Sequence, residues 1–200
     1  MSFTYNEESR IHTLNGKVIP SVSNIVAPLS RDYSKAHPGK LAHKKDLGIA
    51  FHECIRLFLN NDLAEGSIDD DLKYPMQQFQ RFYEQTLMEE QIIAIEQPFC
   101  NKKLKYCGKP DLVTDDCVYD WKLRKYDPVC DSLRMAGYVG LLKDFPPKWK
   151  VVVEFSLSGN YRVHEADKKQ TWPMFVTMLK FYQKKREFEN LLEDWRESIS

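Results

Sequence analysis

Apolar residues recur every three or four positions in four stretches of the chain, which is the spacing of an amphipathic helix. The predicted helices cover residues 41–60, 72–90, 131–142 and 172–196. The second helix is expected to start near Pro75, after an acidic loop over residues 61–71. On the last helix, the apolar side chains expected near one face are Phe175, Leu179, Tyr182, Phe188, Leu191 and Trp195.

Between these helices the pattern changes to short apolar runs, which predict β-strands. Residues 91–100 are expected to form one strand, and residues 101–105 turn into a second. The later strands are predicted over residues 110–114, 117–123, 149–157 and 161–164. Asp115-Asp116 and residues 158–160 provide the turns between them.

The N-terminal region is predicted to begin with a hairpin over residues 10–20, turning at Asn15-Gly16. Ser21 or Ser23 can then cap a short helix that Pro28 ends. Residues 30–45 are charged and contain Pro38-Gly39, so a loop or mobile lead-in is expected there. The order of elements predicts an α/β or α+β fold with a mixed central β-sheet flanked by helices.

Composition excludes two broad classes of protein. A hydrophobic content of 42% excludes whole-chain disorder, and 29 basic against 29 acidic residues exclude a polybasic protein. The zero net charge is the sum of opposed blocks, because residues 31–60 carry +3 and residues 61–98 carry −7. Basic residues also cluster at 102–109 and 122–125, where they could contact phosphate or simply keep the turns soluble.

The chain carries no visible signal for export or for membrane insertion. Its first ten residues hold no apolar core, and no apolar run approaches the roughly 18 residues that a membrane span needs. The five cysteines are odd in number and form no Cys-x-x-Cys. We therefore expect free thiols, a reducing cytoplasmic location, no membrane partner and no zinc site.

Two carboxylates and a lysine are predicted to meet on the central hairpin. Asp120 and Lys122 are two residues apart on one strand and so share a face, and pairing with the preceding strand would bring Asp111 beside Asp120. Neighbouring carboxylates repel each other, and a divalent cation relieves this repulsion. With the lysine, such a site could activate a water and stabilise charge on a phosphoryl oxygen. The alternative is an amphipathic surface hairpin whose polar face is solvated.

Four motifs in order resemble those of the PD-(D/E)XK nuclease superfamily. The central one is Pro110-Asp111 followed by Asp120-Trp121-Lys122. Residues 48–52 (Gly-Ile-Ala-Phe-His) resemble the Gly-x-x-x-His of the RecB-like branch, and residues 133–138 occupy the place of its Gln-x-x-x-Tyr helix. Residues 19–26 are similar to the lead-in of phage exonucleases and of the mitochondrial genome maintenance exonuclease.

This resemblance implies a restriction-endonuclease-like core and a role for each matched residue. Asp111 and Asp120 would bind Mg²⁺ or Mn²⁺, and the backbone carbonyl of Trp121 would complete the set of ligands. Lys122 would orient the attacking water and stabilise the phosphate. His52 would be the additional ligand of the RecB-like branch, although a histidine at a helix border can also be satisfied by a neighbour.

Other residues are assigned by position. Glu96, on the strand before the hairpin, could assist a second metal or could be exposed. Arg134 stands where the branch has glutamine, and its fork could hold a phosphate, while Tyr138 could contact DNA or pack in the core. The further basic residues expected to track phosphates are Lys102, Lys103, Lys105, Lys109, Arg124 and Lys125. No cysteine follows Cys130, so no iron–sulfur cluster is expected.

The sequence thus predicts a metal-dependent DNA nuclease, most simply an exonuclease with a role in DNA recombination or repair. One nuclease domain is expected over residues 1–200, with an N-terminal hairpin and lead-in (1–40), a catalytic core (41–165) and a C-terminal helix (166–200). DNA is the expected partner, and a second copy or a recombination or replication protein are further candidates. The alternative function is a non-catalytic protein that keeps the fold and binds nucleic acid or a partner protein.

Overall fold

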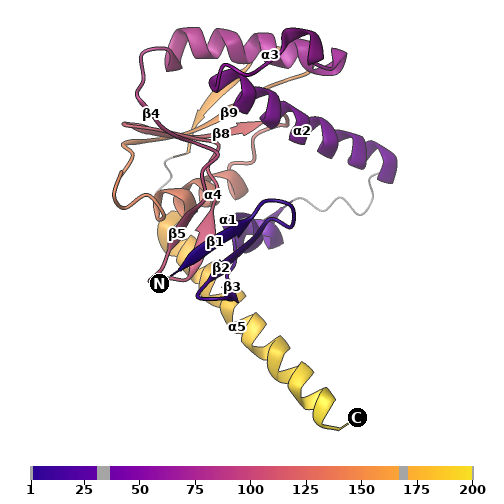
Figure 1. Cartoon of the computed structure of the whole chain (residues 1–200), viewed down its shortest axis with the longest axis vertical. Helices are drawn as coiled ribbons and strands as arrows, with labels where there is room; N and C mark the ends of the chain where they lie inside the picture. The colour runs from indigo at the N-terminus through magenta and orange to yellow at the C-terminus, as the bar shows by residue number, and fades with distance from the viewer. Residues whose placement is uncertain (1, 31–36, 167–170, 200) are drawn as a thin grey trace.

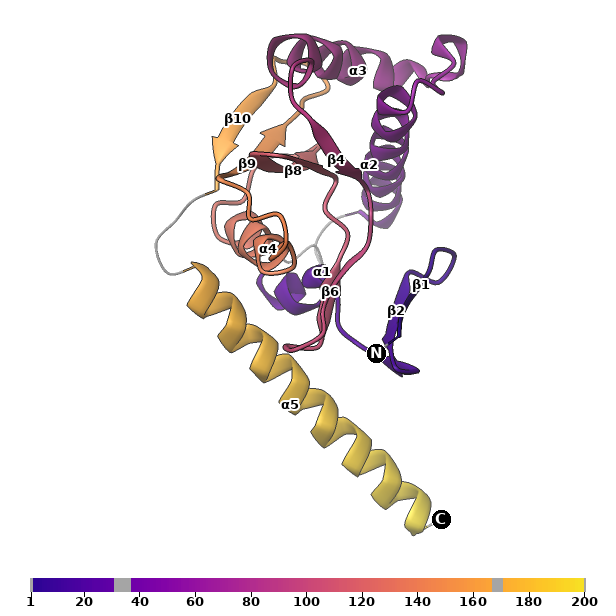
Figure 2. The same cartoon turned by 60° about the vertical axis from the view of Figure 1, so that its left-hand side comes forward.

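A five-stranded mixed β-sheet forms the centre of the molecule (Figures 1 and 2). The structure is a computed structural model that describes residues 2–30, 37–166 and 171–199. The strands, in sheet order, are β10 (Arg162–Glu165), β9 (Trp149–Glu154), β8 (Cys117–Lys122), β7 (Leu112–Thr114) and β4 (Ile92–Ile95). Strands β8 and β9 are parallel and the other neighbours are antiparallel, so the predicted mixed sheet is confirmed.

Helices cover both faces of this sheet because successive side chains of a strand point to opposite sides. On one face, Tyr119 and Trp121 of β8 pack with α2 (Pro38–Leu59) and α3 (Asp70–Phe82). On the other face, Val118 packs with the remaining helices. These are α1 (Val22–Val26), α4 (Cys130–Val139) and α5 (Thr171–Ser198). Asp120 and Lys122 share the second face with Val118, as their spacing predicts.

A separate three-stranded sheet stands at the N-terminus, with strands β1 (Phe3–Asn6), β2 (Ile11–Leu14) and β3 (Lys17–Val18). Asn15 and Gly16 have φ of 51° and 75°, the left-handed backbone of the predicted tight turn. Strand β1 was not predicted, although its sequence Phe-Thr-Tyr-Asn alternates aromatic and polar residues, because it is only four residues long and lies at the start of a polar segment. Ser21 caps α1 through a capping box with Asn24, and a 3₁₀ turn over Ala27–Leu29 follows.

The expected strand over residues 91–100 is wrong, because the structure divides it in two. Strand β4 ends at Ile95, and Glu96 has a φ of 45°, which an extended strand cannot contain. The chain resumes as β5 (Phe99–Asn101), which forms its own hairpin with β6 (Tyr106–Gly108). The break places Glu96 at the edge of the central sheet and separates this hairpin from it.

Two helix boundaries also differ from the prediction. Helix α2 begins at Pro38, which suits the first helical position, so the expected loop is wrong over residues 38–45, while residues 31–36 lie outside the described residues. Helix α3 begins after its N-cap Asp69, and Pro75 lies inside it rather than at its start. A 3₁₀ turn at Glu65–Ser67 precedes α3, and a π-helical turn at Tyr83–Leu87 follows it.

Helix α5 packs on the body through its first turns and then extends away from it (Figures 1 and 2). Phe175 and Leu179 are buried against α1 and α4, whereas Phe188, Leu191 and Trp195 are exposed. The expectation of one apolar face is therefore wrong, because at 100° per residue Phe188, Leu191 and Trp195 lie on the side of the helix opposite Phe175 and Leu179. Across residues 2–30, 37–166 and 171–199, no helix is long and apolar enough to cross a membrane.

Candidate active site

The pairing of β7 with β8 brings Asp111 and Asp120 together. Leu112 pairs with Tyr119, so the residue before Leu112 lies opposite the residue after Tyr119. The Trp121 backbone N–H donates to Asp111 Oδ2 at 2.6 Å, which fixes that carboxylate against β8. Asp111 is 8% exposed and Asp120 is 1% exposed. The alternative of a solvated surface hairpin is therefore wrong.

Lys122 lies beside Asp120 and is 7% exposed. Its ammonium group forms an ion pair with Asp120 and donates to the Trp121 carbonyl at 3.1 Å. A charged lysine is buried at low cost only where acceptors surround it. The Asp120 carboxylate and the Trp121 carbonyl, both expected to bind a metal, thus contact Lys122, which is expected to act next to that metal.

Helix α2 adds His52 to this group. Its neighbours Phe51 and Ile55 are buried against the sheet, which turns His52 toward the end of β7. His52 Nδ1 lies 3.3 Å from Asp111 Oδ1. The histidine motif on α2 and the carboxylate motif on the hairpin therefore meet, although 59 residues separate them in the sequence.

The break after β4 contributes Glu96. Its carboxylate lies 2.7 Å from Lys109 Nζ, and the left-handed backbone at Glu96 redirects the chain at this point. His52, Glu96 and Asp111 each offer one ligand atom, and the three atoms lie within 4.8 Å of one another. One imidazole nitrogen with carboxylate oxygens is a donor set that fits a Mg²⁺ or Mn²⁺ ion. The sequence predicted Asp120 as a ligand with His52 and Asp111 and named Glu96 as a candidate for a second metal, whereas the grouped ligand atoms are those of His52, Glu96 and Asp111.

The buried charges shift one another's titration. Burial alone would raise the pKa of Asp111, but His52, Lys122 and the Trp121 N–H lower it below its ordinary value. Burial alone would lower the pKa of His52, but the Asp111 carboxylate raises it. Burial raises the pKa of Asp120, and the nearby Asp111 adds to this against the opposing effect of Lys122. The Asp120 carboxylate therefore lies where a nearby cation would stabilise its charged form.

A cleft of about 940 Å³ is lined by His52, Glu96 and Asp111, whereas Asp120 and Lys122 are not among the described residues that line it. One wall is α2, and the opposite wall is the N-terminal sheet together with the start of α1 (Figure 2). The basic side chains that line the cleft are Arg10, Lys45, Arg56 and Lys109. Tyr138 also lines it, and burial raises the pKa of its hydroxyl. Arg56 is paired with Glu53, at 2.8 Å from Nε to Oε2, so part of this positive charge is neutralised.

The other predicted substrate-binding residues are distributed more widely. Arg134 of α4 is half-buried near Asp120, and its Nε has no hydrogen-bond partner in the described part of the chain. Lys102, Lys103 and Lys105 occupy the β5–β6 turn, which contacts α5 where Gln183 donates to the Leu104 carbonyl at 2.9 Å. None of these three lysines is among the described residues that line the cleft.

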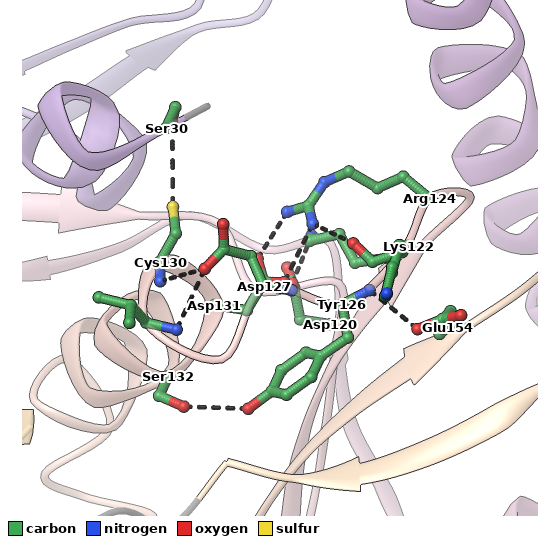
Figure 3. Close-up of polar contacts among 12 residues, drawn as sticks. Ser30, Asp120, Lys122, Arg124, Tyr126, Asp127, Cys130, Asp131, Ser132 and Glu154 are labelled. Carbon is green, nitrogen blue, oxygen red and sulfur yellow. Dashed lines mark hydrogen bonds and ion pairs between the residues drawn. The ribbon is translucent and has the colours of Figure 1, made fainter. Parts of the chain in front are cut away.

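Arg124 and Lys125 follow β8, and neither is among the described residues that line the cleft. The Arg124 guanidinium forms two hydrogen bonds with Asp131, at 3.0 and 2.5 Å, and fastens the loop after β8 to the first turn of α4 (Figure 3). Lys125 is exposed. The geometry of Arg124 is that of a structural ion pair.

Sequence reasoning missed the wall built by the N-terminal sheet. Tyr5, Arg10 and His12 line the cleft, and the Tyr5 and His12 rings stack with centroids 4.5 Å apart. Burial lowers the pKa of His12, with a further contribution from Lys109. The hairpin signal at Asn15-Gly16 identified part of this sheet, but no local pattern placed it opposite α2.

Comparison with known proteins shows the fold. No family model matches the chain, and the search of curated proteins finds no match. The chain is similar to the crystal structure of an alkaline exonuclease, LHK-Exo, from Laribacter hongkongensis, with a TM-score of 0.52 and 11% identity over 90% of this chain and 94% of that chain. A structure of LHK-Exo in complex with dAMP gives a TM-score of 0.45 and 11% identity, over 91% and 95% of the two chains. The chain therefore shares the fold of a nuclease.

Proposed function

We propose that the protein is a metal-dependent DNA nuclease. The observation that carries this proposal is the group of His52, Glu96 and Asp111 that lines an open cleft, with the buried Asp120 and Lys122 beside Asp111. Buried charges with opposed pKa shifts are costly and are typical of functional sites. The shared fold with an alkaline exonuclease supports the same assignment.

The residues of the site suit phosphodiester hydrolysis. A divalent cation held by Asp111, Glu96 and His52, with Asp120 close by, would lower the pKa of a water and neutralise charge on a phosphoryl oxygen. Lys122 carries a compact positive charge next to Asp120 and can orient a water and stabilise the extra charge on phosphate. The Trp121 N–H holds Asp111 in place, so a ligand for the metal is positioned before the metal binds.

A cleavage assay tests this function. The purified protein is incubated with end-labelled linear duplex, circular and single-stranded DNA in Mg²⁺, Mn²⁺ or EDTA. We expect cleavage with metal and none in EDTA, and a loss of about 100-fold or more in Asp120→Asn and Lys122→Met. Lys143→Met, which removes an exposed lysine, is the matched control and should cleave normally. Metal-independent cleavage, or equal rates in all variants, would contradict the proposal.

Metal binding has a readout that does not depend on cleavage. Mn²⁺ at about 100 times its Kd should raise the free energy of unfolding by about 2.7 kcal/mol. Asp111→Asn and Glu96→Gln should reduce this gain because each removes one of the grouped ligand atoms. A full gain in both variants would place the metal elsewhere.

Within this class we favour an exonuclease of the RecB-like type. The similar fold of LHK-Exo and the Gly48 to His52 motif on α2 support this choice. Digestion of linear DNA with circular DNA left intact is the expected result. Nicking or linearisation of circles would instead indicate an endonuclease.

One observation favours a second candidate, a nucleic-acid-binding protein without catalysis. Arg134 places a positive charge near Asp120, where it could substitute for a cation. This candidate predicts salt-sensitive DNA binding that survives both EDTA and Asp120→Asn, with no strand cleavage under any condition. Cleavage that depends on metal excludes it.

A further inference from the structure

Exposed apolar side chains form a stripe along the outer face of α5. Phe181, Phe188 and Trp195 recur every seven residues and are 68%, 61% and 61% exposed. Leu191 and Ile199 lie beside this line and are 65% and 68% exposed. Exposed aromatics at regular spacing on one helix face are typical of an interaction surface.

The stripe is separate from the face that holds α5 to the body. Phe175 and Leu179 are buried against α1 and α4, and at 100° per residue the stripe lies on the opposite side of the helix. The second half of the helix projects beyond the body (Figures 1 and 2). A seven-residue apolar repeat is the pattern of a helix that pairs with another helix.

The charges along α5 are divided between its two halves. Residues 180–186 hold four basic side chains and no acidic one, a net charge of +4. Residues 187–197 hold five acidic side chains against Arg196 alone, a net charge of −4. Ion pairs within the helix join Lys184 to Glu187 and Lys185 to Glu189 across the boundary, but such exposed pairs contribute little.

We propose that α5 pairs with α5 of a second copy of this chain, in an antiparallel arrangement. A two-fold axis near residues 186 and 187 would lay the basic half of each helix along the acidic half of the other, and would bring Lys180 alongside Asp194 of the second copy. A parallel pair would oppose like charges along its whole length. Identical helices with this charge division are therefore complementary to themselves only when antiparallel.

The exposed surface is sufficient for such a pair. Two phenylalanines and a tryptophan, each mostly exposed, offer on the order of 100 Å² apiece, or about 600 Å² across two copies. Leu191, Ile199 and the aliphatic parts of the flanking lysines add to this area. The total approaches the roughly 1,200 Å² of a small specific interface, so a dimer with micromolar affinity is expected.

Sedimentation velocity of the full chain from about 1 to 100 μM tests the surface. We expect the wild type to shift from monomer to dimer over this range. Phe181→Glu with Phe188→Glu should remain monomeric, with unchanged circular dichroism because both side chains are exposed. Met88→Glu, which alters an equally exposed apolar residue far from α5, should dimerise as the wild type does. A wild-type monomer at every concentration, or a dimer or larger oligomer that the double variant retains, overturns the proposal.

Charge exchange tests the direction of pairing. Lys184→Glu with Lys185→Glu and Arg186→Glu makes the whole helix acidic and should weaken self-association at least tenfold. A mixture of Lys180→Cys and Asp194→Cys chains should form a disulfide-linked heterodimer under oxidation, while Asp194→Cys alone should not form a linked homodimer beyond the wild-type background. The reverse crosslinking result would indicate parallel helices and overturn the antiparallel assignment.

Discussion

The Asp131 side chain is fully buried, and its carboxylate accepts three hydrogen bonds. Arg124 supplies two of them, and the Asp127 backbone N–H supplies the third at 2.8 Å (Figure 3). Burial alone would raise the pKa of Asp131, but the Arg124 hydrogen bonds lower it below 3.8. The sequence assigned Arg124 to the phosphate track, since nothing in its spacing from Asp131 predicts that the loop folds back onto α4.

Removing Arg124 should therefore destabilise the fold. Arg124→Met leaves the Asp131 carboxylate buried with only backbone partners, at a cost on the order of 2 kcal/mol. We place the value below that of a fully buried pair because Arg124 is about one third exposed. Urea denaturation measures the change, and Lys125→Met, at the neighbouring exposed position, should stay within about 0.5 kcal/mol of the wild type.

The same pair gives a pH dependence. Because the folded pKa of Asp131 is lowered, its contribution to stability is present above pH 3.8 and is lost as the pH falls through the folded value. The difference in the free energy of unfolding between the wild type and Arg124→Met should narrow as the pH falls from neutrality to the lowered folded pKa of Asp131, because protonation removes the charge that Arg124 pairs. A difference that stays constant down to low pH would mean that Arg124 acts by packing alone.

Among the helices, two interior glycines differ in their surroundings. A Cβ on Gly48 of α2 would have no atom within 4 Å, whereas a Cβ on Gly137 of α4 would lie 2.6 Å from the buried ring of Phe175. Gly137 thus allows α4 and α5 to approach closely, and Gly48 leaves the cleft wall open one turn before His52.

The same substitution should have opposite effects at the two positions. Gly48→Ala should raise the free energy of unfolding by about 0.5–1 kcal/mol, because alanine favours the helix and meets no obstacle. Gly137→Ala should lower it by about 1–3 kcal/mol, because a core aromatic must move. Thermal unfolding of both variants measures the two changes in the free energy of unfolding. Stabilisation by Gly137→Ala would mean that α4 and α5 pack less tightly at Gly137 than the distance to Phe175 indicates.

Elements with a clear period could be predicted from the sequence, and those set by a single backbone conformation could not. Helices α2, α4 and α5 and strands β7 and β8 follow from spacing, and the i, i+2 pattern correctly placed Asp120 and Lys122 on one face. The break at Glu96 depends on one left-handed residue inside an apolar run. This break turns one expected strand into β4 and β5, and it places the Glu96 carboxylate at the candidate site.

At the scale of the whole molecule, the net charge is zero, but folding gathers basic side chains from distant parts of the sequence around the cleft. The basic block before and within α2 supplies Lys45 and Arg56 to the cleft, and the N-terminal sheet supplies Arg10. The lysines at 102, 103 and 105 are instead exposed on a turn whose Leu104 carbonyl accepts a hydrogen bond from Gln183 of α5. Proximity in sequence to the catalytic strand suggested that cluster as a phosphate track, but the β5–β6 hairpin separates its turn from the cleft.

DNA binding should therefore depend on the cleft more than on the lysine-rich turn. Arg10→Ala with Lys45→Ala should weaken binding of a short duplex and reduce the dependence of log K on log salt by about one unit for each phosphate that is no longer neutralised. Lys102→Ala with Lys103→Ala, which removes the same amount of charge, should change affinity much less, because both side chains are outside the cleft as described. Fluorescence anisotropy in EDTA at several salt concentrations separates binding from cleavage. A larger loss of affinity in the turn variant would move the DNA path to the β5–β6 hairpin and α5.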